Sequence, residues 1–138
     1  MNDKKEPFIH VYSRAQALKD GNQFDVSEVA KEVGFVYPVF LTRSVYFRYV
    51  VVPEGVECQD ESGRLWDILW MLYSAIKRPS LRPQQAPGEA EREDRMEFSL
   101  MVRNDNHAPK LVTLLSVCGP NDIDDPRPAI TVMLHSDD

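Results

Sequence analysis

The chain has 138 residues, about the size of one domain, so two separate hydrophobic cores are not expected. Hydrophobic residues make up 43% and charged residues 28%, a globular balance that excludes wholesale disorder and fibrous repeats. Two cysteines are too few for a disulfide-rich secreted scaffold, and no apolar run reaches the roughly 20 residues of a membrane span. We therefore expect a single domain over residues 1–138, cytoplasmic, with reduced thiols and no membrane contact.

The charge is unevenly distributed along the chain. Lys and Arg total 16 against 22 Asp and Glu, a net charge of −6. Residues 1–50 carry seven basic and six acidic groups, a net of +1, whereas residues 51–138 carry nine and sixteen, a net of −7. Phosphate binding depends on Lys and Arg, so an acidic surface argues against direct binding of nucleic acid and favours a basic partner.

The N-terminal part predicts two short amphipathic helices after a loose polar tail at residues 1–7. Residues 13–16 (SRAQ) and 25–28 (DVSE) both have the spacing of a capping box, in which a side chain accepts a hydrogen bond from the third helical N–H. Gly21 and Gly34 follow the two segments and are suited to end them.

Two apolar segments follow. Residues 35–41 (FVYPVFL) are strongly apolar, but Pro38 lacks an N–H and argues against a place in the middle of a sheet. Residues 45–52 (VYFRYVVV) have the composition of a strand, yet a helix-start signal precedes them and Pro53 follows. The flanking signals predict a helix, with a strand as the alternative.

Residues 60–78 (DESGRLWDILWMLYSAIKR) give the clearest element, a long helix with acidic residues early and basic residues late. One apolar stripe at helical spacing predicts the core face: Leu65, Ile68, Leu69, Leu72 and Ile76. A second stripe lies beside it: Trp66, Trp70 and Tyr73. These aromatic side chains either pack on a second layer of the core or face a partner or ligand.

The last third predicts an antiparallel meander. Residues 79–95 are rich in proline and charge and predict a mobile loop. Two runs in which every second residue is apolar flank the turn residues 104–109 and predict a hairpin. Residues 119–128 predict a second loop, and residues 129–134 predict a third strand. In the second run the alternating set is Leu111, Thr113, Leu115 and Val117.

These elements together predict an α+β fold. Short N-terminal helices and one central Trp-rich helix pack on a small antiparallel sheet formed mainly by the C-terminal strands.

The sequence contains no recognisable catalytic, metal-binding or cofactor motif, so we predict no catalytic residue, no metal and no cofactor. Acidic residues and an arginine gather at the start of the Trp-rich helix. The candidate binding residues are Asp60, Glu61, Arg64 and Asp67, with the aromatic residues Trp66, Trp70 and Tyr73. A purely structural alternative is a helix cap with Arg64 paired to Asp60 and Asp67 one turn away.

The chain resembles a small family of uncharacterised bacterial proteins encoded mainly on plasmids, phages and integrative elements. The resemblance rests on residues 12–21 (YSRAQALKDG), 59–67 (QDESGRLWD) and 111–120 (LVTLLSVCGP), and it extends over most of the chain apart from residues 1–7 and 79–95. It implies a bacterial cytoplasm and an accessory gene of a mobile element, without an activity or catalytic residues to transfer.

Three functions follow from these observations. The first is a non-catalytic protein-interaction module, which binds another protein or self-associates through Trp66, Trp70 and Tyr73. The second is an acidic inhibitor of a host nucleic-acid-binding or defence protein, suggested by the charge of residues 51–138. The third is a small enzyme whose polar site lies near Asp60, Arg64 and Asp67.

Overall fold

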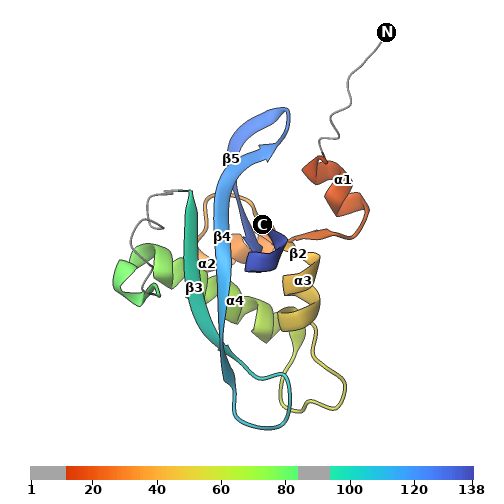
Figure 1. The fold of residues 1–138 in the computed structure, drawn as a ribbon, viewed down its shortest axis with the longest axis vertical. Helices are drawn as coiled ribbons and strands as arrows, with labels where there is room; N and C mark the ends of the chain where they lie inside the picture. Colours follow the sequence, from red (N-terminus) through yellow and green to blue (C-terminus); the bar gives the residue numbers. More distant parts are fainter. Residues whose placement is uncertain (1–11, 84–93) are drawn as a thin grey trace.

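A five-stranded sheet lies at the centre of the protein (Figure 1). The computed structural model describes residues 12–83 and 94–138. The strands are β1 (Gln23–Asp25), β2 (Val39–Thr42), β3 (Arg95–Val102), β4 (Lys110–Asp122) and β5 (Asp125–Met133), in the order β1-β2-β5-β4-β3. Strands β2 and β5 are parallel, and the other neighbours are antiparallel.

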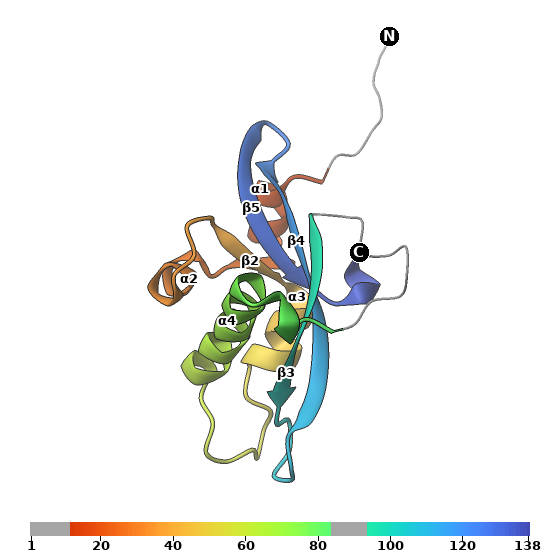
Figure 2. The same ribbon diagram turned by 90° about the vertical axis from the view of Figure 1, so that its left-hand side faces the viewer.

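Helices lie on both faces of this sheet. One face packs against α2 (Ser27–Val33), α4 (Glu61–Lys77) and α3 (Arg43–Val45), which continues as the π-helix η2 (Tyr46–Val50) (Figure 2). The other face carries α1 (Arg14–Lys19) and the C-terminal 3-10 turn η4 (His135–Asp137). The predicted α+β class is confirmed. No helix in the described part of the chain is both long and apolar enough to cross a membrane.

Helix α4 supplies the centre of the hydrophobic core. Ile68, Leu69 and Leu72 are fully buried against the sheet, and Leu65 packs against them. Ile76 was expected to continue this face but is 37% exposed, and Ala75 is the buried side chain of the last turn. The strands add Val39 and Leu41 of β2, Phe98 and Leu100 of β3, Leu114 of β4, and Ile130 and Val132 of β5; α2 adds Ala30 and Val33, and α3 and η2 add Val45 and Val50.

The two short helices form as predicted, but only one has the predicted cap. The Ser13 hydroxyl accepts from the Gln16 N–H at 3.1 Å, which begins α1. Helix α2 begins at Ser27, one residue later than a capping box at Asp25 requires, and the predicted box does not form: the Asp25 carboxylate accepts from the Ser27 N–H at 2.9 Å. The Ser27 hydroxyl instead accepts from the Val39 N–H at 3.0 Å and ties the helix start to β2. Gly34 ends α2 with φ +137°, a conformation that favours glycine.

Residues 43–50 are helical, which confirms the predicted helix for most of residues 45–52. The Thr42 hydroxyl accepts from the Val45 N–H, and the Val51 N–H closes the last π-turn onto the Tyr46 carbonyl at 3.0 Å. The strand composition of this segment reflects burial: Val45 and Val50 are both buried under α4 and the sheet.

Strand β2 corrects the expectation that Pro38 keeps its segment out of the middle of the sheet. The strand begins directly after the proline, at Val39, and lies between β1 and β5. The Pro38 carbonyl still accepts a hydrogen bond from the Ile130 N–H at 2.9 Å. The missing N–H falls outside the ladder, so the proline costs no strand hydrogen bond.

The β3–β4 hairpin is confirmed, and the side chain of β4 buried against α4 is Leu114, outside the alternating set of Leu111, Thr113, Leu115 and Val117. Leu114 lies opposite Phe98 and is fully buried towards α4, whereas Leu111 is 67% exposed. Leu115 is also buried, on the face away from α4. Both odd- and even-numbered positions in the middle of β4 are apolar, because both faces of the strand are covered there. The alternation of apolar residues therefore does not reveal which side chains face α4.

The second predicted loop, residues 119–128, is mostly strand. Strands β4 and β5 continue as a hairpin with Pro120 opposite Pro128, and only Ile123 and Asp124 separate them. In this extension each strand pairs only with the other, so the outer edge of each strand makes no ladder hydrogen bonds. Prolines, which lack an N–H, are tolerated at such an edge.

The segment predicted as a mobile loop, residues 79–95, is ordered at its ends. Residues Pro79–Leu81 form the 3-10 turn η3, and Arg95 begins β3. Residues 84–93 lie outside the described part of the chain, as do residues 1–11, which include the predicted tail at residues 1–7.

The burial of α4 predicts how its two sides respond to truncation. Leu72→Ala removes a fully buried side chain and should lower the free energy of unfolding by about 2–5 kcal/mol through lost burial and a residual cavity. Ile76→Ala on the same helix should cost about 1 kcal/mol or less, because its side chain is partly exposed. Urea unfolding followed by circular dichroism measures both; equal losses would contradict the packing of α4.

Candidate functional site

The polar residues predicted as a site lie at the N-terminal end of α4, and Arg64 is at their centre. Arg64 as a whole is only 6% exposed. The Nε donates to the Val50 carbonyl at 3.2 Å, and the two terminal nitrogens donate to four further acceptors. These are the Gln59 Oε1 (2.7 Å), the Arg103 carbonyl (2.8 Å), the Arg48 carbonyl (3.3 Å) and the Asn104 Oδ1 (2.6 Å).

All five N–H groups of Arg64 are therefore used, and every acceptor is neutral. The predicted pairs with Asp60 and Asp67 do not form; the Asp60 carboxylate instead caps α4 by accepting from the Gly63 N–H at 2.6 Å. Burial lowers the pKa of the Arg64 guanidinium, which stays charged at neutral pH. Its charge is stabilised by carbonyl dipoles at the C-terminal end of η2, where backbone oxygens lack helical partners.

A cavity of about 470 Å³ adjoins this cluster between α4 and the β3–β4 hairpin. Tyr49, Cys58, Asp60 and Asp67 all line it. Burial raises the pKa of the Asp67 carboxyl, although the residue as a whole is exposed. Glu61 points elsewhere: burial first, and then the nearby Glu61 carboxylate, raise the pKa of the Tyr46 phenol. The acidic residues of the predicted site are therefore divided between two surroundings.

The predicted second stripe of α4, Trp66, Trp70 and Tyr73, lies at the surface. We call these three residues the aromatic stripe. Trp66 is 38% and Trp70 48% exposed, and Tyr73 is half-buried. The Trp70 and Tyr73 rings stack with centroids 6.1 Å apart, and the Lys77 Nζ lies 5.4 Å from the Tyr73 centroid. The stripe is thus a preformed row of partly exposed rings on a rigid helix.

At Tyr73 the aromatic stripe reaches a larger cavity, about 800 Å³, which we call the C-terminal groove. It lies between the last turns of α4, the loop after α2 and the start of β3. Its apolar walls include Phe35, Val36, Tyr37, Tyr73, Ile76 and Met96. Sequence analysis did not find the groove, because it joins three segments whose separate patterns predict only a helix, a loop and a strand.

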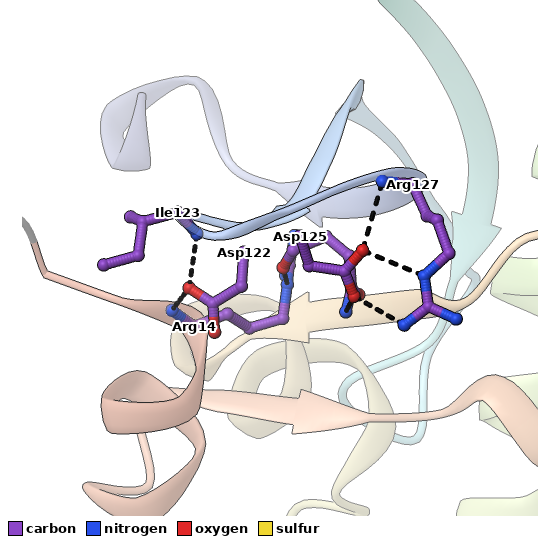
Figure 3. A network of polar contacts seen from close by, with 6 residues as sticks. Arg14, Asp122, Ile123, Asp125 and Arg127 are labelled. Atoms are coloured by element: carbon purple, nitrogen blue, oxygen red, sulfur yellow. Dashed lines mark hydrogen bonds and ion pairs between the residues drawn. The ribbon is translucent and has the colours of Figure 1, made fainter.

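A polar network holds α1 to the β4–β5 hairpin (Figure 3). The Asp122 carboxylate accepts from the Arg14 N–H at 2.9 Å and the Ala15 N–H at 3.0 Å, so it caps a helix more than 100 residues away. The Asp125 carboxylate accepts from the Arg127 side chain and from the Asn121 amide. These donors occupy the carboxylates of Asp122 and Asp125. Within residues 12–83 and 94–138 no group of three His, Cys, Asp or Glu side chains could hold a metal ion.

Comparison with known proteins places the chain in a family without an assigned activity. The chain belongs to a family of unknown function, DUF6573, whose model matches residues 3–138. Neither a curated protein nor a solved structure matches it.

The buried guanidinium predicts that lysine cannot replace Arg64. Arg64→Lys keeps the charge but has fewer donors and no planar fork, so at least two of the five acceptors lose their partner. The free energy of unfolding should fall by roughly 2–4 kcal/mol. Arg48→Lys, at an exposed arginine, is the control and should change it little. Chemical denaturation compares the two variants; an Arg64→Lys protein as stable as the parent would refute this role.

The capping of α1 predicts a pH dependence. The Ile123, Arg14 and Ala15 N–H groups and the Arg14 charge hold the pKa of Asp122 below its usual range. A carboxyl with a depressed folded pKa stabilises the fold fully above the unfolded value of about 3.9, and this contribution is lost as pH falls through the folded pKa. Docking of α1 should therefore persist at neutral pH and weaken in strong acid.

Asp122→Asn should weaken the docking at neutral pH too, because a neutral amide is a poorer acceptor for three N–H groups. Hydrogen exchange at the Ala17 amide, which bonds the Ser13 carbonyl, reports the docking. Asp124→Asn in the same turn removes the same charge and should leave exchange unchanged. Equal exchange in both variants would rule out a specific role for the Asp122 cap.

Proposed function

We propose that the protein is a non-catalytic interaction module that binds a partner protein through the aromatic stripe. The observation that carries this proposal is the exposure of Trp66 and Trp70 on the outer side of a helix whose inner side is fully buried. Large aromatic side chains are enriched at protein interfaces and at their energetic centres. The core fixes the inner face of the helix, and the hydrogen bonds of Arg64 fix its N-terminal end. The aromatic side chains therefore lose little conformational freedom on binding.

The exposed area of these rings is large enough to matter for affinity. Covering the exposed half of a tryptophan removes on the order of 100 Å² from water, which is worth about 2.5 kcal/mol. Two such rings contribute about 5 kcal/mol, or a factor on the order of a few thousand in affinity, before the costs of association are counted. A partner that covers the stripe thus gains most from Trp66 and Trp70.

The small enzyme is a second candidate, favoured by the cavity beside Asp67 and the raised pKa of that carboxyl. The contacts of Arg64 argue against an enzyme, because a guanidinium with five internal partners has no N–H left to bind a substrate. The acidic inhibitor rests on the charge of residues 51–138. The role as an accessory protein of a mobile element rests on the family resemblance.

Site-specific photocrosslinking tests the interaction module. The photoreactive residue p-benzoylphenylalanine replaces Trp70 in one variant and the exposed Ile123, at the β4–β5 turn, in the control. On irradiation in the native cell, position 70 should give a discrete adduct with another protein, and position 123 should not. Adducts at neither position, or equal adducts at both, would overturn the proposal.

Truncation of the stripe gives an independent prediction. Trp70→Ala should still unfold cooperatively, because the ring is nearly half exposed, yet it should abolish most of an adduct trapped from position 66. Thermal unfolding and the same crosslinking assay measure the two effects. A Trp70→Ala protein that loses cooperative unfolding would show that the ring belongs to the core.

A further inference from the structure

We propose that the C-terminal groove holds a short segment of the partner protein in which apolar side chains stand next to carboxylates. This inference rests on the proposed function and names the chemistry of the partner. The groove is continuous with the aromatic stripe, because Tyr73 belongs to both. A segment that crosses Trp70 therefore reaches the groove without a gap.

The apolar walls of the groove are unusually exposed. Val36 is 88% exposed, Tyr37 44% and Ile76 37%, and all three line the same cavity. Isolated exposed apolar residues are ordinary, but a group of them around a hollow is typical of a binding surface. The wall beside Tyr73 is rigid: a Cβ at Gly34 would lie 2.9 Å from the ring, so the backbone packs directly on it.

The charges around the groove favour an acidic occupant. Among the described residues its lining holds Lys77, Arg82 and Arg95 against Asp94. Arg95 pairs with Asp138, whereas the partners of Arg82 among the described residues are the neutral carbonyls of Ala75 and Ile76.

Charge complementarity therefore sets the position of the partner. The chain carries a net charge of −6, so its surface as a whole repels an acidic segment. The basic edge of the groove, extended by the exposed Arg78, attracts such a segment to this place. Apolar side chains then fill the hollow while carboxylates meet Lys77 and Arg82, and the two terms together select an acidic, apolar sequence.

Peptide display on the full chain tests this inference. A random library of about 12-residue peptides is selected on the immobilised protein, and an enriched peptide is then titrated by fluorescence anisotropy. The enriched peptides should carry Asp or Glu beside Leu, Ile, Phe or Trp. Their affinity should fall several-fold when salt rises from about 0.05 to about 0.5 M, because screening weakens exposed charge pairs.

Matched variants locate the peptide. Val36→Glu and Lys77→Glu should each weaken binding about tenfold or more, since one adds a charge to the apolar wall and the other reverses the attraction. Leu111→Glu and Lys110→Glu make the same changes at exposed residues of β4 outside the groove and should have little effect. Circular dichroism confirms that each variant is folded, as the exposure of the four residues predicts.

Other occupants would give different results and overturn the inference. If peptides bind only after residues 84–92 are deleted, the occupant of the groove is that segment of the chain itself. If the protein forms a dimer that Val36→Glu dissociates, the occupant is a second copy of the chain. Peptides without acidic residues, or binding unchanged by Val36→Glu and Lys77→Glu, would exclude the groove chemistry. The proposed function would still stand in that last case if position 70 crosslinks to a partner.

Discussion

Arg64 is the residue on which the arrangement of this site depends. Its guanidinium connects three parts of the chain: the π-helix η2, the start of α4 and the turn after β3. A buried charge is costly when unpaired, so these parts hold their positions because each supplies oxygens that the charge requires. The Asn104 amide joins the same network by donating to the Arg48 carbonyl at 3.1 Å.

The loop before α4 is held by the same hairpin turn. The Asn106 side chain accepts from the Glu57 N–H at 2.9 Å and donates to the Gly55 carbonyl at 2.9 Å, and Arg103 donates to the Glu57 carbonyl. The N-terminal end of α4 is thus fixed by side chains of the β3–β4 turn. Because these contacts fix the position of α4, the helix can carry aromatic rings on its outer side that are not required for its packing.

Helix α4 therefore carries two stripes with different surroundings. The stripe centred on Ile68, Leu69 and Leu72 stabilises the fold, whereas the stripe of Trp66, Trp70 and Tyr73 lies at the surface, where we propose that it binds a partner. Tyr73 joins the two, since its ring meets Phe35 edge-on at 5.6 Å and stacks with Trp70 on the outer side. A partner bound on the outer stripe would therefore contact side chains that the core already orients.

The sequence by itself determined the elements whose signals are local. The caps at Ser13 and Asp60, the end of α2 at Gly34, the long helix and the β3–β4 hairpin all depend on residues a few positions apart. The same holds for the helix at residues 43–50, where flanking signals outweighed a composition typical of a strand. The α+β class follows from these elements in their order.

Tertiary structure alone decided which residues meet. Arg64 has carboxylates one helical turn away, yet it bonds to Asn104 and to Arg103, about 40 residues further along the chain. The register of β4, the internal position of β2 and the C-terminal groove likewise depend on neighbours distant in sequence. Spacing within one segment predicts only the contacts that segment can make with itself, whereas a buried charge or an open groove depends on what the other layers of the fold place beside it.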